Sequence, residues 1–152
     1  MGRLLALDVG SRRIGVALSD ELGLLATPHG AIQRRSLRRD LAAIVDLVRD
    51  QSVERIVVGL PLGLQGQVTQ QTQATHAFAD RLREVSPVPI ELWDESNTSW
   101  EARQIVGSSP ETRRSGRIDA MAAALILQGY LDQRAAVASE AAGAASLREA
   151  RS

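Results

Sequence analysis

The first part of the chain consists of short apolar segments separated by turn residues. Residues 4–7 are apolar without alternation, which is typical of a central strand covered on both faces. Residues 10–11, Gly-Ser, predict a tight turn, after which the apolar residues 14–18 return as a hairpin partner. Residues 24–32 predict a third strand, bent at Pro28. These segments are therefore expected to form a three-stranded meander.

Further along, helical spacing alternates with strand-like runs. Ser36 predicts the N-cap of a helix. The apolar face of that helix consists of Leu37, Leu41, Ile44, Val45 and Val48. Residues 56–59 predict a second buried strand, a helix is expected from about Thr69, and residues 88–93 predict the last strand.

The last third of the chain is predicted to be mainly helical. Thr98 or Ser99 is expected to cap a short helix, and Ser115 a strong helix over residues 116–131. Residues 133–152 are Ala-rich and lack bulky apolar residues, which predicts a flexible tail, with a helical extension as the alternative.

This order of elements predicts an α/β fold with a mixed five-stranded sheet flanked by helices, in which a meander precedes helix–strand units. A chain of 152 residues is expected to form one domain with a single core. We place this domain at residues 1–132 and the tail at residues 133–152.

Composition excludes some classes of protein. No apolar run approaches the roughly 20 residues that span a bilayer, so no membrane partner is expected. The chain has no cysteine, which excludes disulfides and thiolate metal sites, and the expected location is the cytoplasm. The net charge is zero, so no overall basic field indicates nucleic acid, although all 18 basic residues are arginine.

Three acidic residues stand where an unpaired charge would be costly. Asp8 ends the first apolar run, Glu95 follows the last predicted strand, and Asp119 lies in an apolar helix. Sites in α/β folds form beyond the carboxyl ends of the strands, so these acids are expected to meet. Asp119 has no cationic residue in the following helical turn, so we expect it not to form a simple ion pair. Hard oxygen ligands of this kind suit Mg²⁺ or Mn²⁺, as two ions about 4 Å apart.

Each acid also has a simpler interpretation. Asp8 can bond its own backbone in a turn. Glu95 can be a solvated strand end, and Asp119 can be a first-turn acid that the helix dipole stabilises by about 0.5 kcal/mol. The metal site is predicted only by the three acids together.

Clusters of arginine accompany these acids. Arg12 and Arg13 follow Asp8 closely and are expected to contact phosphate. Two further pairs, Arg34 with Arg38 and Arg35 with Arg39, are predicted to lie on a solvated helix face.

Four motifs occur in order along the chain. They read LALDVGSRRIGVALSD, IVVGLP, WDESNTSWEAR and GRIDAMAAALILQGYL. With these motifs the chain resembles the YqgF/RuvX family, whose members are described as Holliday junction resolvases or pre-16S rRNA nucleases of RNase H-like fold. The resemblance implies metal-dependent cleavage of phosphodiesters in structured nucleic acid, with processing of the 5′ end of pre-16S rRNA as the predicted function. It also implies that Asp8, Glu95 and Asp119 are the catalytic and metal-binding acids.

The chain departs from the family pattern at three places. Ser96 follows the glutamate where the family usually has Arg, the loop at residues 62–66 lacks the usual Asn and Asp, and Ser115 replaces a common Lys. Arg117, with Arg113 or Arg114, is the candidate for supplying the missing positive charge to nucleic acid. These departures put substrate choice and catalytic rate in question, and they leave all three acids in place.

Several alternatives stay open. A Holliday junction or other DNA endonuclease and a non-catalytic nucleic-acid-binding module both fit the pattern. The strand–turn–strand motif around Asp8 also resembles the phosphate-binding hairpin of actin-like ATPases, which need two such lobes. The sequence does not distinguish pre-rRNA from branched or single-stranded DNA, nor a monomer from a homodimer.

Overall fold

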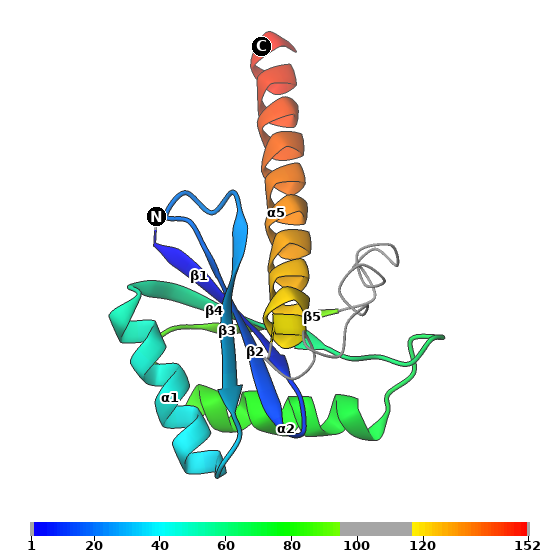
Figure 1. The fold of residues 1–152 in the computed structure, drawn as a ribbon. Helices are drawn as coiled ribbons and strands as arrows, with labels where there is room; N and C mark the ends of the chain where they lie inside the picture. Colours follow the sequence, from blue (N-terminus) through cyan, green and yellow to red (C-terminus); the bar gives the residue numbers. More distant parts are fainter. Residues whose placement is uncertain (1, 95–116, 152) are drawn as a thin grey trace.

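The computed structural model describes residues 2–94 and 117–151 and contains a five-stranded mixed sheet (Figure 1). Its strands are β1 (Arg3–Val9), β2 (Arg13–Ser19), β3 (Ala26–Gln33), β4 (Val53–Leu60) and β5 (Ile90–Asp94), in the spatial order β3-β2-β1-β4-β5. The first three strands form an antiparallel meander, and β4 and β5 join it in parallel to β1. The predicted α/β fold with a mixed five-stranded sheet is confirmed.

The third strand begins at Ala26 rather than at residue 24. A β-bulge lies next to Pro28, where the bend was expected, because Val16 pairs with Gly30 whereas Ala17 pairs with Pro28. Gly30 has a φ of 148°, a backbone conformation that glycine adopts because it has no Cβ atom. Proline is tolerated here because β3 is an edge strand.

Two helices begin where the sequence predicted, the first at the predicted cap Ser36 and the second at Thr69. Helix α1 (Leu37–Asp50) follows Ser36, whose hydroxyl accepts a hydrogen bond from the Arg39 amide. Helix α2 (Gln70–Val85) follows Thr69, which forms a reciprocal capping box with Thr72. Both caps satisfy amide groups that would otherwise lack partners in the first helical turn.

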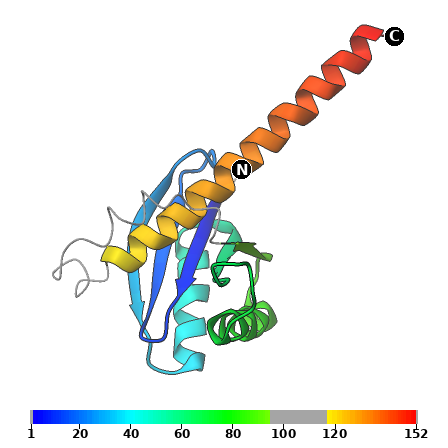
Figure 2. The ribbon, with the colours of Figure 1, turned by 90° about the vertical axis from the view of Figure 1, so that its right-hand side faces the viewer.

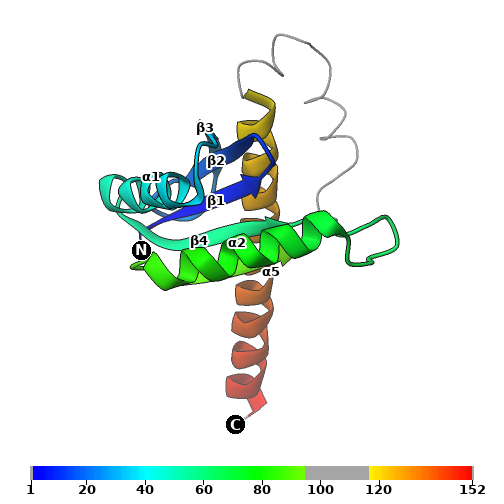
Figure 3. The ribbon, with the colours of Figure 1, turned by 90° about the horizontal axis from the view of Figure 1, so that it is seen from below.

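The sheet separates two apolar cores, whereas a single core was expected. One lies between the sheet and helices α1 and α2, and it includes Leu5, Leu7 and Val9 of β1. The other lies under α5 (Arg117–Arg151) and includes Leu4 and Ala6. Figures 2 and 3 show α5 on one side of the strands and α1 with α2 on the other. Because side chains alternate along a strand, Asp8 belongs to the α5 face.

Helix α5 extends well beyond the sheet. Its 35 residues continue through the Ala-rich segment, which is the helical alternative stated for this part of the chain. Residues 132–146 are exposed, and this half of the helix projects away from the other elements (Figures 1 and 2). Among the described residues, no helix combines the length and the apolar character needed to cross a membrane.

Candidate functional site

The candidate site lies where the parallel strands end. Strands β1, β4 and β5 are parallel neighbours, so their carboxyl ends reach the same edge of the sheet. Asp8 is the penultimate residue of β1 and is half-buried. This is the edge at which α/β sheets usually bind ligands.

A glycine brings Asp119 to the same place. Asp8 pairs with Gly15 of β2, so the two residues share a face of the sheet. A side chain at Gly15 would collide with the backbone carbonyl of Asp119, because the first turn of α5 rests directly on this glycine. The close approach therefore places Asp119 beside the strand pair that carries Asp8. Two of the three predicted acids therefore lie at the same strand pair.

Asp119 forms an ion pair, contrary to the sequence-based expectation. Its Oδ2 atom accepts a hydrogen bond of 2.8 Å from Nε of Arg13, and the two side chains are 26% and 28% exposed. The carboxylate is thus half-buried and neutralised by a neighbour. The expectation was wrong because it considered only residues within one helical turn, whereas Arg13 is 106 residues away in the sequence.

The remaining predicted site residues are Arg12, Arg117 and Glu95. Arg12 is exposed in the turn between β1 and β2, and Arg117 is exposed as the first residue of α5. Glu95 lies outside the described residues, as do the predicted caps at residues 98, 99 and 115. Within residues 2–94 and 117–151, no group of three His, Cys, Asp or Glu side chains is clustered closely enough to hold a metal ion.

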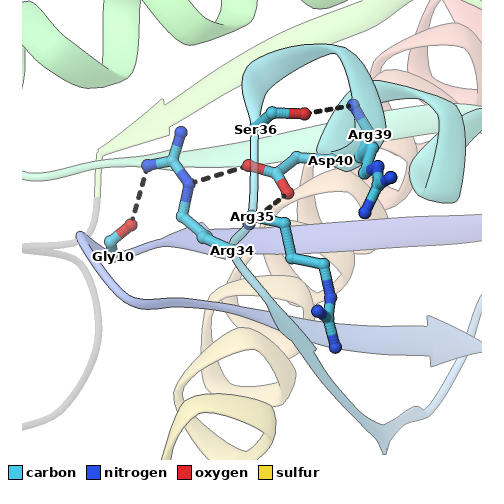
Figure 4. A network of polar contacts seen from close by, with 6 residues as sticks. All are labelled: Gly10, Arg34, Arg35, Ser36, Arg39 and Asp40. Carbon is cyan, nitrogen blue, oxygen red and sulfur yellow. Dashed lines mark hydrogen bonds and ion pairs between the residues drawn. The ribbon is translucent and has the colours of Figure 1, made fainter.

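A network around Arg34 was not predicted. Arg34 and Arg35 both precede α1, so the expectation that they lie on a solvated helix face is wrong. The Nη1 atom of Arg34 donates to the Gly10 carbonyl at 3.0 Å, and its Nε donates to Oδ2 of Asp40 at 3.2 Å (Figure 4). Its backbone amide donates to the Arg12 carbonyl at 2.9 Å. One residue thus connects the β1–β2 turn to the start of α1.

The acid in this network is deeply buried. Asp40 is only 2% exposed, and its second oxygen accepts a hydrogen bond of 3.1 Å from the Arg35 amide. The Arg34 guanidinium also lies 5.3 Å from the centre of the Phe78 ring. A signal for the network was present in the sequence. Asp40 falls on the apolar stripe of α1, where a charged residue requires a partner.

An open hollow lies beside this turn on the α1 and α2 side of the sheet. Its volume is about 960 Å³, and its lining includes Ser11, Arg34, Gln71 and Phe78. Gln71 donates from Nε2 to the Val9 carbonyl at 2.9 Å and so holds the end of β1 from this side. The turn is therefore braced by α1 and the strand end by α2.

Comparisons with known proteins identify relatives of this chain. A family model described as RuvX, Holliday junction resolvase, matches residues 2–133. A Symbiobacterium thermophilum protein named "Putative pre-16S rRNA nuclease" is 46% identical over 136 residues, which cover 88% of this chain and 94% of the relative. A protein of the same name from Syntrophus aciditrophicus is 46% identical over 132 residues, 86% of this chain and 88% of that protein.

One solved structure shows a similar fold. Thermus thermophilus RuvC in complex with Holliday junction substrate aligns with a TM-score of 0.56 at 15% identity, over 88% of this chain and 96% of that chain. This similarity supports the shared fold of the two chains.

Proposed function

Because the chain belongs to the RuvX family of Holliday junction resolvases, we propose that it is a nuclease that hydrolyses phosphodiesters of structured nucleic acid at the Asp8 edge of the sheet. The observation that carries this proposal is the close approach of α5 to Gly15, which brings Asp119 beside the strand pair of Asp8. For the substrate we propose the 5′ end of pre-16S rRNA, as the names of the relatives suggest, met in the cytoplasm. The family description supports a DNA junction as the second candidate.

The acids at this edge suit a divalent metal. Asp8 and Asp119 supply hard carboxylate oxygens from a strand end and a first helical turn, and both are half-buried. We propose Glu95, which follows the last residue of β5, as the third ligand. Bound Mg²⁺ or Mn²⁺, in the proposed arrangement two ions, would stabilise the leaving oxygen and lower the pKa of an attacking water.

The arginines of the turn have distinct proposed roles. Arg12 is exposed and is proposed to bind a substrate phosphate, which its planar fork suits. Arg13 neutralises Asp119 and lies at the same edge, so it can exchange that carboxylate for a phosphate oxygen of the substrate. Arg117 is exposed at the start of α5, two residues before Asp119, and is proposed as a further phosphate contact.

A cleavage panel tests this function. The purified chain is incubated with a pre-16S rRNA 5′ leader, a four-way DNA junction and single-stranded DNA, each with Mn²⁺ and with EDTA. We expect cleavage of the RNA leader in Mn²⁺ that stops in EDTA. Preferential cleavage of the junction would establish the DNA resolvase alternative. Binding of nucleic acid without cleavage of any substrate would contradict the proposal and identify a non-catalytic binding module.

A further inference from the structure

We propose that Arg34 is a positioning residue that braces the β1–β2 turn, residues 10–13, so that its arginines meet the substrate. The inference rests on the proposed nuclease function, because the turn carries Arg12 and Arg13. It assigns to Arg34 no contact with the substrate.

The turn depends on Arg34 at two points. Within the turn, the Gly10 amide donates to the Arg13 carbonyl at 2.9 Å. The Gly10 and Arg12 carbonyls, on either side of Ser11, accept hydrogen bonds from the side chain and the backbone amide of Arg34. Fixing two carbonyls of so short a segment limits the directions in which its side chains leave the backbone.

Arg34 is itself firmly held. The Asp40 carboxylate, which accepts a hydrogen bond from Nε of Arg34, is buried, and the guanidinium lies over the Phe78 ring. A guanidinium offers separate nitrogens for the carboxylate and the Gly10 carbonyl, as Figure 4 shows, whereas a lysine offers a single nitrogen. Arginine is therefore specifically suited to connect α1 with the turn.

The brace leads to the candidate site through Arg13. This residue ends the turn, and its guanidinium holds Asp119 across the edge of the sheet. Asp8, by contrast, is held by its pairing with Gly15 inside the sheet. Loosening the turn should therefore weaken substrate binding more than it slows the chemical step.

The test compares Arg34→Lys with the matched control Arg38→Lys, an exposed arginine of α1. For each protein, the Kd for the RNA leader is measured over a range of salt concentrations, together with kcat, KM and Tm. We expect Arg34→Lys to raise Kd and KM about tenfold, as for one lost hydrogen bond to a charged donor. Its kcat should change less, and its salt slope should fall because the turn arginines lose phosphate contacts, although residue 34 keeps its charge. Arg38→Lys should match the parent throughout.

Other outcomes overturn the proposal. Unchanged Kd and KM in Arg34→Lys would mean that the turn does not need the brace. If Arg34→Ala instead loses about 0.7 of the salt slope while Arg34→Lys binds like the parent, Arg34 contacts a phosphate directly. Should Arg34→Lys prove unfolded, Asp40→Asn, which keeps the shape of the acid, takes its place, and Kd and KM equal to those of the parent would again overturn the proposal.

A measurement without substrate separates this inference from the proposed function. Amide hydrogen exchange at Gly10 and at the residue in position 34 is followed by NMR in the parent and in both lysine variants. Faster exchange in Arg34→Lys alone supports the brace even if the parent cleaves no nucleic acid, in which case only the function fails. Equal exchange in all three proteins overturns the brace even if the parent is an active nuclease.

Discussion

The contact between Gly15 and α5 allows a sharp test of how the site is built. We expect Gly15→Ala to force the two elements apart, because the added methyl group would collide with the backbone carbonyl of Asp119. A backbone group cannot rotate away as a flexible side chain would. Either the first turn of α5 or strand β2 must move, and the next turn of α5 packs against β2 in the core that contains Ala17 and Ala123.

The expected cost follows from this geometry. Overpacking a close contact typically costs about 1–3 kcal/mol. For a chain of this size, a loss of about 2 kcal/mol corresponds to a fall in Tm of about 4–8 °C. A shift of Asp119 by about 1 Å would also slow cleavage on the order of 100-fold. The substitution should therefore impair activity more strongly than stability alone explains.

Thermal melts and cleavage rates in Mn²⁺ measure both effects. Gly143→Ala is the control, because a methyl group there meets open space within α5 and should stabilise the helix by up to about 1 kcal/mol. A Gly15→Ala protein with the Tm and the cleavage rate of the parent would refute the packing of α5 on β2 described above.

Three further predictions concern the charged and polar groups. Replacing Arg12 and Arg13 by alanine should lower the salt slope of nucleic-acid binding by up to about two units. An unchanged slope would mean that neither arginine contacts a phosphate. Asp119→Asn loses the ion pair with Arg13, which should lower the unfolding free energy in EDTA by up to about 1 kcal/mol. Mn²⁺ should raise the Tm of this variant much less than that of the parent, and equal rises in Tm would count against Asp119 as a metal ligand. Tyr130→Phe removes a hydrogen bond of 2.7 Å to Glu91 and should cost about 1 kcal/mol in denaturant unfolding. Burial, and secondly this hydrogen bond, raise the pKa of Tyr130 above its usual value of 10.0. The difference in unfolding free energy between parent and variant should therefore be fully present below pH 10 and decline as the pH rises through the raised pKa. A difference that does not change with pH would disprove this.

Local features of the fold could be predicted from the sequence. Ser36 and Thr69 cap helices because a hydroxyl before an apolar periodic run satisfies the first amides, and this depends on neighbouring residues alone. The bulge beside Pro28 was not predicted, because it depends on the register between two strands. The length of α5 stayed open for a related reason: alanine favours a helix, but the exposed segment buries no side chain that would demand one.

The sequence predicted which residues belong to the site, but it predicted only some of the contacts between them. Asp8 and Asp119 were expected to meet. The feature that places the Asp119 backbone beside the strand pair of Asp8, the absence of a side chain at Gly15, has no periodic signature. The ion pair of Asp119 and the brace by Arg34 join residues from different elements, so helical spacing could not show them.

We propose that Asp8 holds a catalytic metal ion in this nuclease. The cleavage rate of the pre-16S rRNA leader by the parent and by Asp8→Asn, each in saturating Mn²⁺, tests this role. Asparagine keeps the shape of the side chain and removes the charge proposed to hold the metal. We expect the rate to fall at least about 100-fold, or about 2.7 kcal/mol of barrier, while RNA binding survives. An Asp8→Asn protein that cleaves the leader as fast as the parent would contradict the claim.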